Sequence, residues 1–274
     1  MNINQLVKKH DFKFSKKYGQ NFIGDENLLA SIATDARITE DDVVIEIGPG
    51  AGTLTREIAK RAKKVIAYEI DRSLAPILDE TLAGFDNVEL IFGDFSVLKP
   101  SEIDALAGGP FKVVANLPYY ITTPLLFQVL DCKNMQSATV MVQKEVAERI
   151  CAKENTADYG VLSVSVQLKS RPEITRIVNR NCFTPAPNVD SAIVRIEIAP
   201  REGIEDEALL KNLVRSAFAM RRKTLVNNLI GGMGLSRADS EALLQEMDLP
   251  VTVRGETLSV NQFIKLAGII AKKR

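Results

Sequence analysis

Short apolar runs alternate with helix-length segments over residues 43–143. The segments between the runs carry apolar residues at helical spacing, most clearly in 53–61 and 73–82. Strands that are apolar throughout are expected where both faces of a sheet are covered, as in parallel sheets. The alternation therefore predicts a doubly wound α/β fold with a mostly parallel sheet. Its strands are expected at residues 43–47, 65–69, 88–92, 112–115 and 138–142.

The pattern changes in the second half of the chain. Residues 173–178 and 191–198 are expected to be late strands around the loop at 183–187, forming an antiparallel addition at the sheet edge. The sequence thus predicts two domains, residues 1–202 with the sheet and residues 203–274 as a small all-α domain. Helices of this second domain are expected at 206–218, 223–230, 237–246 and 260–271.

Composition narrows the class of protein without identifying a reaction. The chain has 274 residues, of which 46% are hydrophobic and 26% charged, as in globular proteins. No apolar run approaches the roughly 18 residues of a membrane-spanning helix, and the N-terminus lacks the apolar stretch of a signal peptide, so we expect a cytoplasmic protein. The only histidine is His10, and the three cysteines form no CxxC pair, which argues against a metal site and against histidine-dependent catalysis.

Basic residues concentrate at the two ends of the chain. Lys and Arg total 35, as do Asp and Glu, so the formal net charge is zero. Residues 1–17 hold five Lys and one Asp, and residues 201–274 hold twelve basic and nine acidic residues. A nucleic-acid partner would therefore meet local basic patches rather than a uniformly cationic protein. Ordinary solvated surface charge is the alternative.

A glycine-rich turn follows the first predicted strand. Gly48, Gly50 and Gly52 lie where that strand ends and a helix begins, and glycine allows a ligand to approach the backbone closely. The dinucleotide fingerprint G-x-G-x-x-G would place its last glycine at position 53, where this chain has Thr53. A pyrophosphate-binding dehydrogenase is therefore disfavoured, although the glycines could also serve only a tight turn.

Two acidic residues follow neighbouring strands of the same predicted sheet. Glu69 closes the second strand and could accept hydrogen bonds from both hydroxyls of a ribose. Asp94 follows the third strand and could accept a hydrogen bond from an adenine amino group. The carboxyl ends of parallel strands form the edge at which open α/β sheets bind ligands. Together with the glycine turn, these acids predict a nucleoside site, whereas either alone could be a solvated loop carboxylate.

The segment Asn116-Leu117-Pro118-Tyr119 follows the fourth strand and suits methylation of an exocyclic amine. The lone pair of an adenine amino group is delocalised into the ring, so this nitrogen is a poor nucleophile. Two acceptors on its N–H protons, the Asn116 side-chain carbonyl and the Leu117 or Pro118 backbone carbonyl, would direct the lone pair at a methyl donor. Tyr119 offers a ring face for an extruded base. The alternative is an ordinary proline turn.

Together these motifs resemble those of the ribosomal RNA adenine N6,N6-dimethyltransferases, which are class I S-adenosylmethionine-dependent methyltransferases. The bacterial small-subunit enzymes give the best match, and the resemblance covers essentially the whole chain. It implies a Rossmann-like methyltransferase sheet followed by a small helical domain. The matching motifs lie at residues 18–22, 46–52, 69–71, 93–94, 116–124, 143–149, 183–191 and 221–225.

The resemblance implies roles for individual residues. Phe183 in the loop at 183–187 would supply a second stacking surface for the target base, with core packing as its alternative. Many relatives have Leu where this chain has Ile23, a conservative change if that position contributes mainly a backbone contact. The target amine would be held by Asn116, Leu117, Pro118 and Tyr119. The cofactor S-adenosylmethionine would be lined by Asn21, Ile23, Gly48, Gly50, Glu69, Asp94 and Asn116.

The resemblance also implies a substrate and a partner. In this family the substrate is a pair of adjacent adenosines in the 3′-terminal hairpin loop of 16S rRNA, and each receives two methyl groups. The partner would be 16S rRNA in the immature small subunit (pre-30S), bound by a monomer during ribosome biogenesis. The helical domain would help position the enzyme there. Phosphate contacts are expected from Lys16, Lys17, Arg221, Arg222 and Lys223, with Lys8, Lys9 and Lys13 as further candidates.

Three other functions compete with this one. A large-subunit rRNA adenine methyltransferase of the macrolide-resistance type would share the pocket, but those enzymes usually lack the continuation of Tyr119 by residues 120–123 seen here. The protein could act chiefly as an assembly factor that holds the immature subunit. An NAD-dependent dehydrogenase is disfavoured by Thr53 and by the missing proton-transfer histidine.

Overall fold

The computed structural model describes residues 3–273, apart from the side chains of Asn4 and Lys16. It divides into two compact units. The first contains the chain up to Ala147 together with Glu173–Ile198, and the second contains Glu148–Pro172 and the chain from Ala199 onward. Within residues 3–273 no helix is long and apolar enough to cross a membrane.

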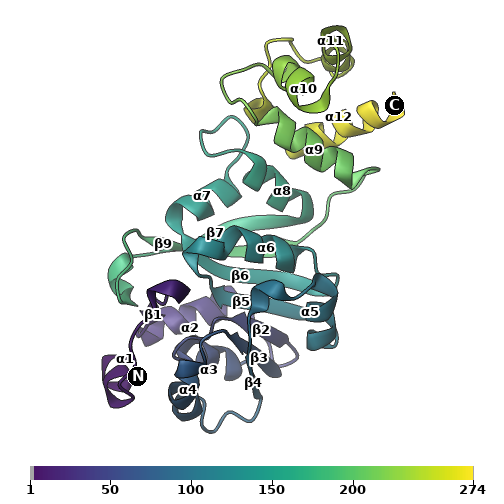
Figure 1. The fold of residues 1–274 in the computed structure, drawn as a ribbon. Helices are drawn as coiled ribbons and strands as arrows, with labels where there is room; N and C mark the ends of the chain where they lie inside the picture. The colour runs from purple at the N-terminus through teal and green to yellow at the C-terminus, as the bar shows by residue number, and fades with distance from the viewer. Residues whose placement is uncertain (1–2, 274) are drawn as a thin grey trace. The chain divides into compact units, whose positions relative to one another are not determined.

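A seven-stranded sheet forms the centre of the first unit (Figure 1). Its strands are β2 (Val43–Ile47), β3 (Lys64–Glu69), β4 (Val88–Phe92), β5 (Phe111–Asn116), β6 (Met135–Gln143), β7 (Ser170–Val178) and β9 (Ser191–Ile198). The spatial order is β4-β3-β2-β5-β6-β9-β7. Neighbours from β4 to β6 are parallel, whereas β9 pairs antiparallel with β6. The predicted doubly wound α/β fold with an antiparallel addition is confirmed.

Helices cover the sheet because its strands present apolar side chains on both faces. Val44 and Val65 are completely buried and pack with residues of α2 and α3, while α5 and α6 contact β2 and β6. The Asp25 side chain caps α2 by accepting hydrogen bonds from the N–H groups of Asn27 and Leu28. The helices are α2 (Glu26–Asp35), α3 (Thr53–Ala59), α4 (Ala75–Thr81), α5 (Pro100–Ala107) and α6 (Thr122–Leu130), with the short turns η2 (Arg72–Leu74), η3 (Phe95–Val97), η4 (Tyr119–Ile121) and η5 (Arg180–Cys182). The helix α7 (Lys144–Cys151) is divided between the two units, with its residues from Glu148 onward in the second.

Residues 3–24, which we call the N-terminal arm, pack against α4 and the glycine turn. The arm contains α1 (Ile3–Lys9), η1 (Lys16–Tyr18) and β1 (Phe22–Ile23), and β1 pairs antiparallel with β8 (Phe183–Thr184). The rings of Phe12, Phe14 and Phe22 lie against one another at centroid distances of 5.1 to 5.9 Å. These rings join a cluster that includes buried Leu74, Ile77 and Leu78, so apolar burial fixes the arm on the first unit.

The second unit is helical. Its core contains the completely buried Phe263 and Tyr159, and the Tyr159 hydroxyl donates a hydrogen bond to the Leu258 carbonyl at 2.9 Å. The helices are α8 (Val161–Lys169), α9 (Glu207–Ala217), α10 (Leu225–Met233), α11 (Arg237–Glu246) and α12 (Val260–Lys272), with the turn η6 (Gly255–Thr257). The division differs from the boundary expected after residue 202, because α8 packs into the helical core through Val164 and Leu168.

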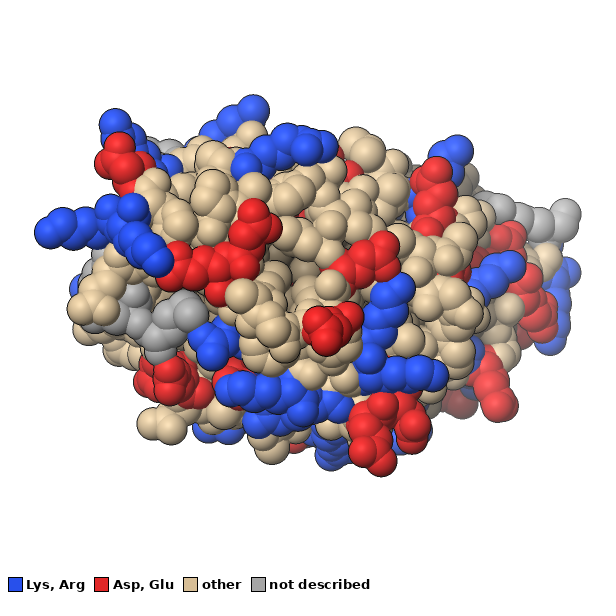
Figure 2. Space-filling view, turned by 90° about the horizontal axis from the view of Figure 1, so that it is seen from below, with Lys and Arg blue, Asp and Glu red and all other residues tan. Residues whose placement is uncertain are grey.

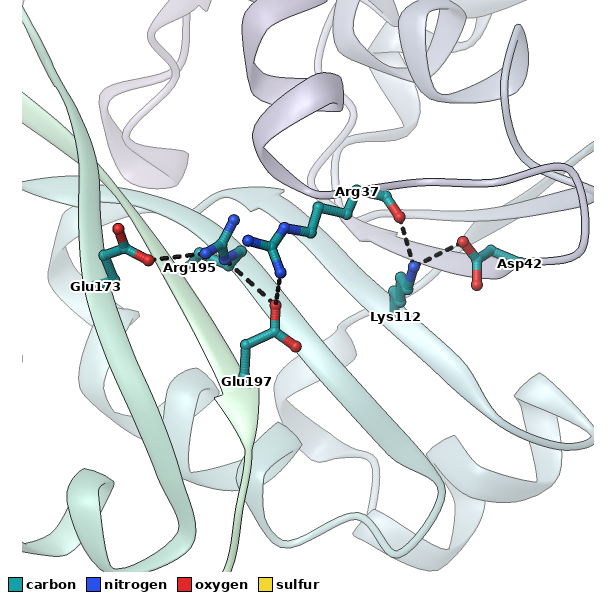
Figure 3. Close-up of polar contacts among 6 residues, drawn as sticks. All are labelled: Arg37, Asp42, Lys112, Glu173, Arg195 and Glu197. Atoms are coloured by element: carbon teal, nitrogen blue, oxygen red, sulfur yellow. Dashed lines mark hydrogen bonds and ion pairs between the residues drawn. The ribbon is translucent and has the colours of Figure 1, made fainter.

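A network of ion pairs ties strands of the first unit together at the edge where the parallel strands begin (Figure 3). The Lys112 ammonium donates to Asp42 Oδ2 at 2.7 Å and to the Arg37 carbonyl at 2.6 Å. Arg195 of β9 reaches Glu173 of β7 at 2.8 Å and Glu197 at 3.3 Å. Burial alone would raise the pKa of Asp42, but Lys112 and Thr39 outweigh it and hold that pKa below its usual value. We call these six residues of Figure 3 the edge network.

Candidate functional site

A cleft opens at the carboxyl ends of β2, β3 and β5 in the first unit. Most of its lining comes from four segments that lie far apart in the sequence: residues 18–23 of the arm, 48–51 with 53–54 of the glycine turn, 69–70 at the end of β3, and 116–119 at the end of β5. Leu29 of α2 and Glu46 of β2 complete it. The structure therefore brings together most of the predicted cofactor and catalytic residues. None of the described residues that line the cleft is Lys, Arg or His, so it is poorly suited to a pyrophosphate.

The glycine turn leaves room for a ligand. Gly48 has φ 72°, and a side chain built there would meet no protein atom within 4 Å, so the space in front of it is open to the cleft. Gly50 has φ 57°, and its Cβ would lie 2.9 Å from Cε1 of Phe22 in the arm. Gly48 thus forms a cradle that a Cβ would partly fill, whereas Gly50 allows the arm to close on the turn.

Glu69 is the acceptor at the centre of the cleft. Its side chain is 4% exposed, and its two carboxylate oxygens accept hydrogen bonds from the N–H of Gly50 at 3.0 Å and of Asp71 at 2.8 Å. Burial raises the pKa of Glu69, the charge of Asp71 adds to that effect, and the backbone donors oppose it. Each oxygen keeps a second lone-pair direction for an outside donor, so Glu69 can accept from the two hydroxyls of a ribose.

Glu46 is a site residue that the sequence-based predictions omit, although it lies in the motif at residues 46–52 and lines the cleft. It is 1% exposed, and its Oε2 accepts no hydrogen bond among the described residues. Burial and the neighbouring charge of Glu69 raise the pKa of Glu46 to about 8, against the opposing effect of the Thr55 hydroxyl. The buried Glu69 and the nearby buried Asp71, with no Lys or Arg in the described lining, therefore make the cleft an environment that favours positive charge on a ligand.

Asn116 holds its amide in a defined orientation at the end of β5. Its Nδ2 donates to the backbone carbonyl of Asn21 at 2.9 Å. Because that carbonyl can only accept, the amide NH₂ must face the arm and Oδ1 must face the other way. Among the described residues nothing donates to Asn116 Oδ1, so this oxygen is available to an amine in the cleft.

The backbone after Asn116 resolves which carbonyl can act beside it. The Pro118 carbonyl already accepts from the Ile121 N–H at 3.2 Å and from the Thr122 hydroxyl at 3.0 Å. The Leu117 N–H donates to the Met141 carbonyl at 3.1 Å, while no described group donates to the Leu117 carbonyl. Of the two carbonyls left open by the sequence, the one of Leu117 is therefore available. Burial raises the pKa of Tyr119, whose hydroxyl lies 2.7 Å from Ser191 Oγ.

The predicted arm residues reach the cleft in different ways. Asn21 lines it, and its side-chain Nδ2 donates to the Gly19 carbonyl at 3.0 Å, which stabilises the turn of the arm. Ile23 is 4% exposed, packs in the core, and offers its carbonyl to the Thr53 hydroxyl at 2.9 Å. The side chain of Ile23 is thus a packing residue, in keeping with a mainly backbone contribution.

Two predicted residues lie outside the cleft lining. Asp94 is exposed and accepts hydrogen bonds from the Ser96 N–H at 2.9 Å and hydroxyl at 2.6 Å, near the exposed Tyr120, whose pKa it helps to raise after the larger effect of burial. Phe183 is 4% exposed and packs in the cluster of Ile23 and Leu29. In this conformation Phe183 is a core residue, as the alternative held, because its strand β8 pairs with β1.

The basic residues of the arm differ in availability. Lys9 forms an ion pair with Glu80 at 2.8 Å, whereas Lys8 and Lys13 are exposed. Lys17 is exposed with its Nζ 5.3 Å from the centroid of the Tyr18 ring, and the side chain of Lys16 lies outside the described residues. Figure 2 shows the lower face of Figure 1, where blue and red side chains alternate rather than forming a field of one sign.

In the second unit the predicted basic run is exposed on the turn between α9 and α10. Arg221 donates to the Ala157 carbonyl, which uses part of its guanidinium. Arg222 and Lys223 are exposed, and neither side chain forms an ion pair with another described residue. These two cations are therefore accessible to a phosphate backbone.

Comparison with known proteins connects this site to a family. A model of the family "Ribosomal RNA adenine dimethylase" matches residues 11–272. The chain is 45% identical to ribosomal RNA small subunit methyltransferase A of Clostridioides difficile (strain 630), over 98% of this chain and 95% of that protein. It is 46% identical to the protein of the same name from Lactococcus lactis subsp. lactis (strain IL1403), over 96% and 92%.

Two solved structures are similar over nearly their full length. A dimethyladenosine transferase from Plasmodium falciparum matches with a TM-score of 0.80 and 27% identity, over 92% of this chain and 98% of that chain. The 23S rRNA methyltransferase ErmE matches with a TM-score of 0.71 and 31% identity, over 90% and 98%. The similarity extends through the helical region as well as the sheet.

Proposed function

The chain belongs to the ribosomal RNA adenine dimethylase family, and from this premise we propose that it dimethylates the N6 amino groups of two adjacent adenosines in the 3′-terminal hairpin loop of 16S rRNA. It is an S-adenosylmethionine-dependent rRNA adenine dimethyltransferase. The observation that carries the proposal is the pair of unoccupied acceptors, Asn116 Oδ1 and the Leu117 carbonyl, on residues that line the cleft. The proposed substrate, 16S rRNA of the immature small subunit, places the reaction in the cytoplasm and in ribosome biogenesis.

The residues of the cleft fit S-adenosylmethionine, which supplies an electrophilic methyl group on a sulfonium when bound. Glu69 would accept from the ribose hydroxyls, and the open space in front of Gly48 admits the ligand next to the backbone. Glu69 and Asp71 are buried, and no Lys or Arg lies in the described cleft lining, so these two acids favour a cationic ligand. Asp94, although outside the described cleft lining, has Oδ2 available for the adenine amino group, because Ser96 occupies Oδ1.

The reaction is then a matter of holding the target amine. Asn116 Oδ1 and the Leu117 carbonyl would each accept one N–H of the adenine amine, which turns its lone pair toward the cleft. Tyr119, fixed through its hydroxyl to Ser191, would present its ring to the base. Each transfer adds one methyl and releases one proton from the nitrogen to water. No side chain needs to act as a strong base, and positioning supplies most of the acceleration.

Mass spectrometry of the 3′ hairpin of 16S rRNA, from cells with and without this protein, tests the proposal. We expect two N6,N6-dimethyladenosines that disappear when the protein is removed and return when it is restored. Purified protein with S-adenosylmethionine should also methylate small subunits from the deletion strain. Loss of methylation in large-subunit rRNA instead would assign the chain to 23S rRNA methylation, the activity for which ErmE is named. Full subunit maturation by a methylation-deficient Asn116→Ala chain would make holding the subunit the main role.

A further inference from the structure

We propose that Gln20 is a positioning residue that fastens the N-terminal arm to the cofactor site, so that the position of the arm and the affinity for the cofactor are coupled. The inference rests on the proposed function in so far as the ligand of the cleft is S-adenosylmethionine. It assigns a role to a residue that lines the cleft and whose amide bridges the arm and β3. All contacts of Gln20 described below lie within the first unit.

Gln20 uses both ends of its amide. Its Oε1 accepts a hydrogen bond from the Ser15 N–H at 2.7 Å, and its Nε2 donates to Asp71 Oδ2 at 2.7 Å. A backbone N–H only donates and a carboxylate only accepts, so these two partners fix which end of the amide faces which side. Ser15 belongs to the arm, and Asp71 follows β3 by two residues. Gln20 therefore joins the arm's backbone to the sheet edge that carries the cofactor site.

Asp71 connects Gln20 to Glu69, the proposed acceptor of the ribose hydroxyls. Its backbone N–H donates to Glu69 Oε1 at 2.8 Å, and Glu69 Oε2 accepts from the Gly50 N–H at 3.0 Å. A continuous chain of hydrogen bonds thus runs from Ser15 through Gln20, Asp71 and Glu69 to the glycine turn. A displacement of the arm would therefore change the position of the Glu69 carboxylate, which we assign to the ribose.

Gln20 supplies the one hydrogen bond that Asp71 Oδ2 accepts from a described residue. It is 8% exposed and forms no ion pair with any Lys or Arg among the described residues. Its donors are the Ser73 N–H and hydroxyl, both on Oδ1, and the Gln20 amide on Oδ2. Removal of the amide leaves Oδ2 without its donor beside a second buried carboxylate, Glu69, at a cost that is large for charged groups.

Two further contacts show that the same arm reaches the working parts of the site. The Phe22 ring lies against Gly50, where a Cβ would come within 2.9 Å of it. The Asn21 carbonyl accepts from Asn116 Nδ2 at 2.9 Å. The other end of the arm carries exposed Lys8 and Lys13. Phosphate contacts at these lysines would therefore also hold residues 20–22 in the position that closes the cleft.

The test compares Gln20→Ala with Gln136→Ala, a matched substitution at an exposed position of β6. Calorimetry with S-adenosylhomocysteine measures binding, and trypsin cleavage after Lys13 and Lys17 measures arm order. In the unchanged protein and in Gln136→Ala, the ligand should slow cleavage of the arm. Gln20→Ala should bind about tenfold more weakly, the scale of one hydrogen bond to a charged group, and at ligand saturation its arm should remain more readily cleaved.

Kinetics separate positioning from a general loss of structure. In Gln20→Ala the KM for S-adenosylmethionine should rise about tenfold while kcat at saturating donor stays within about twofold. Asp71→Asn, singly and combined with Gln20→Ala, completes a double-mutant cycle, in which we expect the two losses of affinity not to add. If Gln20→Ala fails to fold by circular dichroism, Gln20→Asn and Asp71→Asn carry the same comparison.

The outcomes distinguish the two proposals. An unchanged protein that binds neither S-adenosylhomocysteine nor S-adenosylmethionine overturns the proposed function and this inference with it. If it binds and methylates, but the ligand does not protect the arm, the coupling is wrong and the function stands. Equal affinity of Gln20→Ala and Gln136→Ala for the ligand also overturns the coupling, as does full additivity in the cycle.

Discussion

The buried carboxyl group of Glu46 gives the protein a measurable pH dependence of folding. Its pKa is raised to about 8 by burial and by Glu69, whereas an unfolded Glu titrates near its ordinary value of roughly 4.3. Between these two values the folded state holds a proton that the unfolded state has lost, so stability falls as pH rises. Integrated from pH 6 to pH 8, the loss due to Glu46 is about 2 kcal/mol.

Glu46→Gln removes this titration while it keeps the shape of the side chain. Urea unfolding followed by circular dichroism, without ligand, gives the free energy of unfolding at pH 6, 7 and 8. Relative to the unchanged protein, the variant should gain about 2 kcal/mol over this range. Glu40→Gln, at an exposed position, serves as the control and should show no such trend. A constant difference between Glu46→Gln and the unchanged protein at all three pH values would refute a protonated Glu46.

Three further predictions concern binding and transfer. Asn116→Ala should slow single-turnover methylation about 10- to 100-fold, the scale of one lost hydrogen bond to a developing charge. Its affinity for S-adenosylhomocysteine should change only a few-fold. A normal rate of methylation would remove Asn116 from catalysis. The pKa of Glu69 is raised, and the ribose prefers the ionised acceptor, so cofactor affinity should be full above that pKa and fall as pH drops through it. Calorimetry should find this loss of affinity at a higher pH than for an ordinary carboxylate. Glu69→Gln should abolish the pH dependence. Arg222→Ala with Lys223→Ala should reduce the slope of log affinity for 16S rRNA against log salt by about one per lost phosphate contact, and an unchanged slope would place those contacts elsewhere.

The central sheet and the main site segments could be predicted from the sequence because their signals are local. The predicted runs at 43–47, 88–92 and 191–198 coincide with β2, β4 and β9. Parallel strands bring their carboxyl ends to one edge, so a glycine turn, Glu69 and Asn116 could be expected to meet there.

Other features depended on tertiary contacts that no local pattern records. For Phe183 the sequence predicts a stacking surface for the base, whereas its burial in the core follows from the pairing of β8 with β1, which no local pattern shows. The choice between the carbonyls of Leu117 and Pro118 is made by η4, whose turn occupies the Pro118 oxygen. Gln20 lies in the motif at residues 18–22, but Asp71, to which it donates a hydrogen bond, is 51 positions away in the sequence. The helix α8 joins the second unit through packing that its own periodicity does not specify.

The edge network lies at the end of the sheet where strands begin, whereas the cleft lies where they finish. Asp42 precedes β2, Lys112 stands near the start of β5, and Glu197 pairs with Ser137 near the start of β6. The electrostatic contribution of these pairs to holding the strands in register is thus spatially separate from the groups that meet the ligand. Substitutions at the cleft therefore leave the ion pairs of the edge network intact. The end of the sheet where strands begin can be kept constant while the ligand-binding end is redesigned.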